Sequence, residues 1–295
     1  LYIIPLEEHL RLPRSFLGTA SPKSSIGRTD LFVRLLTSNH GVFDKVPEGY
    51  EGRLYVLVIP KSFDTVAYPG ISLNQLKFYV GNPYLDDTEL SFALRKYDLL
   101  LDDQGRVYNN SDINVDGGIY LSVKIVEGMV GYMAKITDRP VLLKKGVNQA
   151  EHYWDVINSN YGSIVLEAER FYILGTKQNI RIPGNITGEL KPISPEFGDL
   201  RSHCAGHVEP GYGYGKDGSI NGNMLTLEVR TFENKFRLSD RQYIARLLCG
   251  RLTNESDKIY GESIGSSFVS QRVPTLSPFF KSHSRSGEQL RLFDD

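Results

Sequence analysis

The sequence predicts a mainly β protein made of two tandem β-sandwich or β-roll domains with a few short helices. Short runs of β-branched and aromatic residues, separated by Gly, Pro, Asn and Asp at intervals of about ten residues, indicate many strands. Helical patterns are few, and parts of the chain resemble one another in the same order, which indicates an internal duplication. The chain has 295 residues, 40% of them hydrophobic, and this suffices for two packed cores.

Each predicted element follows from its local pattern. Taken in order, the strand-like runs are residues 1–4, 54–59, 65–67, 76–80, 119–125, 163–167, 171–174 and 225–230. Residues 87–96 begin with an N-cap candidate and acidic residues and end with basic ones, which predicts a short helix. Residues 148–158 are a candidate for a second helix.

Three segments recur along the chain. Residues 2–13 match 172–183 at an offset of 170, residues 46–50 match 208–212 at an offset of 162, and residues 73–78 match 244–249 at an offset of 171. The middle match requires a shorter loop before the turn in the second copy and a longer one after it, and the glycine-rich stretch 213–223 has room for the extra residues.

These matches set the predicted domain boundaries. We expect a first domain over residues 1–110, a second over 111–280 and a polar tail over 281–295, with the joint in the Asp-, Asn- and Gly-rich stretch 102–118. The chain begins inside a strand pattern without a methionine, so we expect the first domain to lack its natural N-terminus.

Composition excludes several classes of protein. The 34 basic and 35 acidic residues balance to a net charge of −1, so neither a nucleic-acid footprint nor a polybasic membrane patch is expected. No apolar run approaches the roughly 20 residues of a membrane span and no signal peptide is visible, which indicates a cytoplasmic protein. The two cysteines are too few for a disulfide framework or a Cys-x-x-Cys metal site.

A carboxylate on a late strand is the first candidate functional residue. In the run 225–230 the apolar residues alternate, so Thr226, Glu228 and Arg230 share the other face. This pattern alone favours a solvated face with an ordinary surface glutamate. At an offset of 171 the partner of Glu228 is Leu57, so the first copy lacks the carboxylate.

An early loop supplies the second candidate. Lys23, Ser24, Ser25 and Arg28 bring two hydroxyls and two cations together beside Gly27, as polyphosphate binding requires. By residue type alone, a solvated basic turn is the commoner case. The second copy has no such cluster at residues 193–199, so each copy keeps one half of a site.

Together these residues resemble a known family. The stretch Lys23 to Arg28 resembles the Arg-Ser-Ser-x-x-Arg loop of dCTP deaminases, which have the dUTPase-like fold. Ala205 through Glu209-Pro210-Gly211-Tyr212 to Glu228 resembles their Ala-x-x-x-Asp-Pro-Gly-Trp turn and the strand that carries their catalytic glutamate. Tyr260 and Gln271 match their C-terminal segment in spacing, and the duplication is most similar to the two-domain bacterial members.

The resemblance implies roles for individual residues. Glu228 is the implied general base for deamination of the cytosine of dCTP, which gives dUTP and ammonia. The implied phosphate ligands are Lys23, Ser24, Ser25, Arg28, Tyr260 and Gln271. The implied ligands of base and sugar are Ala205, His207, Glu209 and Tyr212. The resemblance further implies Mg²⁺ bound through the triphosphate, no protein metal site, no catalytic zinc, and a homo-oligomer with trimer-type contacts.

Departures from the family pattern leave other functions open. Lys23 and His207 stand where relatives have arginine, and Ser267 stands where they have lysine. A dUTPase, a bifunctional deaminase and dUTP diphosphatase, and a catalytically silent nucleotide-binding regulator are the alternatives. A metal site at His203 and His207 is disfavoured because the pair lies in a turn rather than on a helix face.

Overall fold

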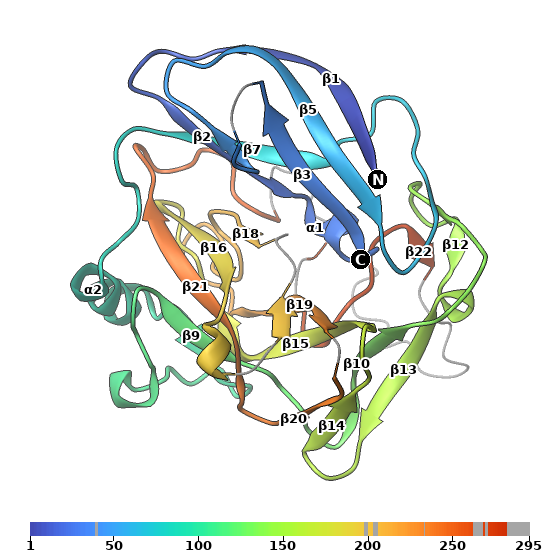
Figure 1. The fold of residues 1–295 in the computed structure, drawn as a ribbon. Coiled ribbons are helices and arrows are strands. Elements are labelled where there is room, and N and C mark those ends of the chain that lie inside the picture. Colours follow the sequence, from blue (N-terminus) through green and yellow to red (C-terminus); the bar gives the residue numbers. More distant parts are fainter. Residues whose placement is uncertain are drawn as a thin grey trace, which may run out of the picture.

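The protein has the mainly β architecture that the sequence predicts (Figure 1). The computed structural model describes residues 1–38, 41–197, 200–202, 206–232, 234–261, 268 and 271–281. The helical elements are α1 (Ser24–Gly27), α2 (Asp87–Tyr97), η1 (Asn110–Asp112), η2 (Ala150–His152) and η3 (Pro195–Phe197). Within the described ranges no helix is long and apolar enough to cross a membrane.

The strands form two groups in space, shown blue to cyan and green to orange in Figure 1. The first group contains β1 (Tyr2–Arg11), β2 (Leu17–Pro22), β3 (Leu31–Thr37), β4 (Lys45–Val46), β5 (Glu51–Pro60), β6 (Thr65–Val66) and β7 (Asn74–Tyr79). The later strands are β8 (Leu100–Leu101), β9 (Ile119–Ser122), β10 (Gly128–Ala134), β11 (Val141–Leu142), β12 (Asn148–Gln149), β13 (Trp154–Ser159), β14 (Ser163–Leu166), β15 (Phe171–Ile180), β16 (Ile186–Pro192), β17 (Leu200–Ser202), β18 (His207–Val208), β19 (Asn223–Thr231), β20 (Phe236–Ser239), β21 (Tyr243–Arg251) and β22 (Phe280–Lys281).

Strand pairing shows the duplication directly. The order β1-β5-β3 of the first copy recurs as β15-β19-β17 in the second. Ile3 lies opposite Leu57 in the first sheet, and Ile173 lies opposite Glu228 in the second. The alignment of Glu228 with Leu57 therefore holds in three dimensions.

A second pair of sheets confirms the unequal loops. The order β4-β2-β7 recurs as β18-β16-β21. Gly18 pairs with Val46, as Gly188 pairs with Val208. A methyl group on either glycine would come within 2.9 Å of the Cβ atom of its valine partner, so both copies use glycine for the same close approach. The extra residues of the second copy lie in the turn before β19.

The helix prediction was right for one segment and wrong for the other. α2 carries a capping box in which Asp86 accepts from the N–H of Glu89 and Glu89 accepts from the N–H of Asp86. Residues 148–158 are not a helix but form β12, η2 and β13. The backbone of β13 pairs with β10, and its β-branched residues suit that sheet.

The two copies share buried packing. Leu31 and Val56 of the first copy lie in one cluster with Trp154 and Ile173 of the second. Although α2 and β8 precede the predicted boundary at residue 110, Leu90 packs with core residues of the second copy, and β8 pairs with β15. The boundary stays a prediction, but the shared core holds the two copies together.

Candidate active site

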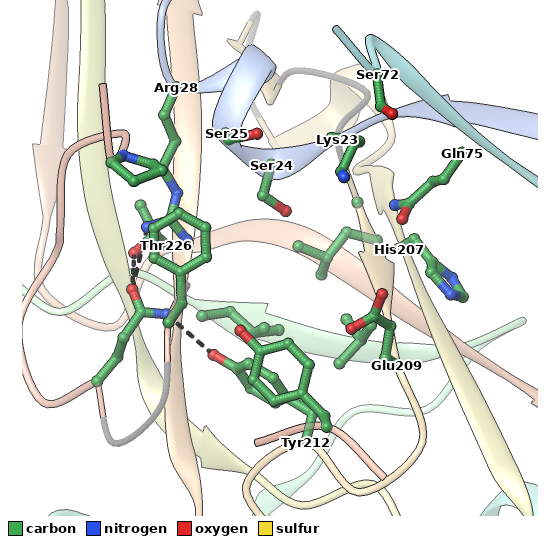
Figure 2. A pocket seen from close by; sticks show the side chains of 18 of the residues that line it. Lys23, Ser24, Ser25, Arg28, Ser72, Gln75, His207, Glu209, Tyr212 and Thr226 are labelled. Carbon is green, nitrogen blue, oxygen red and sulfur yellow. Dashed lines mark hydrogen bonds between the residues drawn. The ribbon is translucent and has the colours of Figure 1, made fainter. Parts of the chain in front are cut away.

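A cavity of about 410 Å³ lies where α1 of the first copy faces β18, β19 and the following turns of the second. The predicted residues that line it are Lys23, Ser24, Ser25, Arg28, His207, Glu209, Tyr212, Tyr260 and Gln271. Figure 2 shows Lys23, Ser24 and Ser25 on one side, with His207, Glu209 and Tyr212 across from them. The fold therefore brings the two predicted half-sites together within one chain.

α1 leaves its serine hydroxyls free for a ligand because its backbone N–H groups bond to carbonyl oxygens within the same turn. The N–H groups of Ile26 and Gly27 both donate to the carbonyl oxygen of Lys23, at 2.8 and 3.0 Å. Ile26 is fully buried and anchors the turn, whereas Ser24 and Ser25 are only half-buried. Two hydroxyls and the Lys23 ammonium group can therefore meet a ligand.

Arg28 lies deeper and is tied to the C-terminal segment. Its Nη1 donates to Gln271 Oε1 at 3.2 Å, to the Thr275 carbonyl at 3.0 Å and to Thr275 Oγ1 at 2.6 Å. The guanidinium group also lies over the ring of Phe268, 3.5 Å from its centroid. Burial lowers the pKa of Arg28 to about 10, with Glu228 acting in the opposite direction, so the group stays charged at neutral pH.

Gln271 connects Arg28 to the opposite wall. Its Oε1 also accepts from Thr226 Oγ1 at 3.0 Å, and its Nε2 donates to the Tyr212 hydroxyl at 3.3 Å. The Tyr212 hydroxyl in turn donates to the carbonyl of Met224 at 2.7 Å. Both copies and the C-terminal segment thus share one buried polar network, which fixes their relative positions.

Glu228 is buried, contrary to the surface position that the alternating pattern favours. The residue is 4% exposed and does not line the cavity, but it follows Thr226 on the same face of β19, and Thr226 does line it. Burial raises the pKa of Glu228 to about 8; the charge of Arg28 opposes this and that of Asp30 adds to it. A carboxyl group in this state exchanges a proton near neutral pH.

The same face of β19 continues into an ion pair between the copies. Arg230 contacts the buried carboxylate of Asp30, whose Oδ2 also accepts from Ser62 Oγ at 2.6 Å. The face that looked solvated in the sequence is therefore pressed against the first copy, which explains why it is polar and yet buried.

The second-copy residues of the cavity differ in charge state. Burial and the nearby Lys77 lower the pKa of His207 to about 4, so its imidazole is neutral at pH 7. Burial raises the pKa of Glu209, against the opposing charge of Lys23. The rings of Tyr212 and Tyr260 lie 5.2 Å apart in a tilted arrangement and form an aromatic wall.

Several lining residues were not predicted. Thr226 could have been found, because it shares the strand face of Glu228, but the others have no local signal. The others include the polar or aromatic residues Ser72, Gln75, Lys145 and Phe268. Topology alone brings their segments to the cavity.

Some predicted features lie outside the described residues. Ala205 is one of them, as are His203, Cys204 and Ser267. In the parts that are described, no group of three or more His, Cys, Asp or Glu side chains could hold a metal ion.

Comparisons with known proteins point to one family. A family model described as the N-terminal domain of 2'-deoxycytidine 5'-triphosphate deaminase matches residues 1–82, and the model of the C-terminal domain matches residues 94–280. The crystal structure of 2'-deoxycytidine 5'-triphosphate deaminase from Agrobacterium tumefaciens is similar, with 31% identity and a TM-score of 0.77 over 87% of this chain and 75% of that chain. A search of curated proteins found no match.

Proposed function

Because the chain belongs to the 2'-deoxycytidine 5'-triphosphate deaminase family, we propose that it converts dCTP and water into dUTP and ammonia. The observation that carries the proposal is the meeting of the Lys23–Arg28 turn and the Glu228 strand at one cavity. One side of this cavity suits a polyphosphate, and the other is lined by Thr226, which shares a strand face with the buried Glu228.

We propose Glu228 as the general base. Its carboxylate takes one proton from water as the water oxygen bonds to C4 of cytosine and the C4=N3 π bond opens, and it later returns that proton to the departing nitrogen. The second proton of the water moves to N3 as the C4=O bond forms. The C4–N4 bond breaks and ammonia leaves. A pKa of about 8 suits this role, because a base whose pKa lies near the working pH accepts and releases a proton readily.

Arg28 tunes the pKa of this base in our proposal. Its positive charge lowers the pKa of Glu228 and so favours the reactive carboxylate. Gln271 and Thr275 hold the guanidinium group in place. Arg28 therefore acts on Glu228 as well as on the phosphates.

We propose that the substrate lies across both copies. Lys23, Ser24, Ser25, Arg28, Tyr260 and Gln271 hold the triphosphate, and Ala205, His207, Glu209 and Tyr212 hold the base and sugar. The polar groups on α1 match phosphate oxygens, while the carboxylate of Glu209 can accept from a sugar hydroxyl.

Mg²⁺ enters this proposal with the nucleotide and not with the protein. Among the described residues that line the cavity, Glu209 is the one carboxylate, so phosphate oxygens and water must supply most ligands. We propose that no zinc takes part. A zinc-selective chelator should then leave the rate unchanged, and removal of Mg²⁺ should weaken binding of dCTP.

We also propose a homo-oligomer, which sedimentation of the full chain can test.

A product assay tests the function. The protein is incubated with dCTP and Mg²⁺, and ammonia and pyrophosphate are measured together. Ammonia without pyrophosphate is the expected result. Release of both would identify a bifunctional deaminase and diphosphatase, and release of neither, with nucleotide bound, would identify a silent regulator.

A further inference from the structure

Lys145 lines the candidate active site, although nothing in its sequence surroundings indicates this. It lies in the turn between β11 and β12 of the second copy, and its side chain is exposed. Over the described part of the chain, its ammonium group makes neither a hydrogen bond nor an ion pair. A lysine at a cavity without a protein partner can direct its charge to a ligand.

Backbone contacts place this turn beside α1. The N–H of Gly146 donates to the carbonyl of Pro278 at 2.9 Å, and the neighbouring Ser277 hydroxyl donates to the carbonyl of Ser25 at 2.7 Å. Pro278 also lines the cavity. Lys145 therefore lies on the same side of the cavity as the serine hydroxyls of α1.

The charges around the cavity favour a polyanion there. The lining cations are Lys23, Arg28 and Lys145, and the lining carboxylate among the described residues is Glu209. Lys23 interacts electrostatically with Glu209, and Arg28 is engaged by Thr275 and Gln271. Among these cations, Lys145 and Lys23 have ammonium groups that no described residue holds in a hydrogen bond or an ion pair, so both can direct their charge to a ligand.

We propose that Lys145 binds the terminal phosphate of the nucleotide and makes the enzyme prefer triphosphates over shorter phosphates. An ammonium group suits this end of the ligand, since it carries a compact charge with three donors and needs no fixed geometry. The inference rests on the proposed function, because it assumes that the nucleotide places its phosphates at α1.

Lys145→Ala tests the proposal, with Lys144→Ala as matched control. Lys144 is the adjacent exposed lysine and does not line the cavity. We expect Lys145→Ala to lower kcat/KM for dCTP about 10-fold, on the scale of one charge-assisted hydrogen bond, and to leave that for dCMP unchanged. Lys144→Ala should leave kcat/KM for both nucleotides unchanged. Lys145→Arg, which keeps the charge, should retain most of the wild-type kcat/KM for dCTP.

Calorimetric binding of dCTP and dCMP separates this proposal from the proposed function. If the wild-type protein binds nucleotide but releases no ammonia, the proposed deaminase function is wrong. The ratio of the Kd values for dCTP and dCMP still tests whether Lys145 binds the terminal phosphate. An unchanged ratio in Lys145→Ala, or an equal loss in Lys144→Ala, would overturn the role of Lys145. The difference in affinity between dCTP and dCMP should also become smaller at high salt, because salt screens the charge of the exposed Lys145 side chain.

Discussion

The carboxyl group of Glu228 is buried because its strand face lies between the two copies. A glutamate carboxylate in water has an ordinary pKa of 4.5 and is a weak base at neutral pH. Burial raises the pKa of Glu228 to about 8, and Arg28 limits the rise. The fold thereby makes one acid suitable for proton transfer.

Replacement of Glu228 by glutamine should separate chemistry from binding. We expect Glu228→Gln to retain binding of dCTP and to lose at least ~10²-fold in kcat, the usual scale for a positioned base. Ammonia release gives the rate, and calorimetry gives the affinity. Glu127→Gln is the control because Glu127 is exposed. A Glu228→Gln rate close to that of the wild type would remove Glu228 from the mechanism.

The raised pKa of Glu228 also predicts how stability depends on pH. Because the folded-state pKa lies above its ordinary value of 4.5, the neutral form is favoured in the folded protein. The neutral carboxyl group contributes to the free energy of unfolding. This contribution is fully present below pH 4.5 and is lost as the pH rises toward and through about 8. The wild type should therefore lose stability relative to Glu228→Gln over that interval.

Denaturant unfolding of both proteins from pH 5 to pH 9 measures this difference. Plotted against pH, the difference in the free energy of unfolding should have a slope of up to roughly 1.4 kcal/mol per pH unit, the value for one proton. A difference that does not change with pH would mean that Glu228 ionises normally in the folded state.

At the scale of elements, the turn before β19 requires glycine at position 211. Gly211 has φ of 86°, and a Cβ atom there would lie 1.7 Å from Cγ2 of Ile259. Its neighbour Pro210 accepts from the N–H of Tyr260 at 3.0 Å, so displacement of the turn would also move a cavity residue.

Gly211→Ala should therefore be strongly destabilising. We expect a loss of roughly 3 kcal/mol in the free energy of unfolding, from backbone strain and overpacking combined. Gly162→Ala is the control, because Gly162 has φ of 66° but its nearest atom would be 3.8 Å away. It should show the backbone cost alone, about 1–2 kcal/mol. Equal losses in the two variants would contradict the steric argument.

Local patterns predicted some elements and missed others for physical reasons. α2 was predictable because its capping box and charge distribution lie within its own residues. Residues 148–158 were not, because pairing of β13 with β10 and of β12 with β22 decides their conformation. The pattern around Glu228 gave its strand face but not its burial, because that face lies against the first copy, where Arg230 pairs with Asp30. The motif residues of the site were predictable, whereas Lys145 reaches the cavity through folding alone.

At the scale of the molecule, the duplication has divided one site between two copies. The first copy provides α1 with its cations and hydroxyls, and its counterpart of Glu228 is Leu57. In the second copy η3 follows β16 as α1 follows β2, but its residues Pro195–Phe197 include no cation. Each copy therefore depends on the other for the missing half.

A mixing experiment tests whether one chain holds both halves. Arg28→Ala damages the first-copy half, and Glu228→Gln damages the second-copy half. If the site forms within a chain, then coexpression of the two variants leaves every chain with one damaged half. We expect the purified mixture to be no more active than the sum of the separate variants. Sites formed between chains would instead combine an intact Arg28 with an intact Glu228, and recovery of roughly a quarter of wild-type activity, the fraction that random pairing gives, would show that the halves come from different chains.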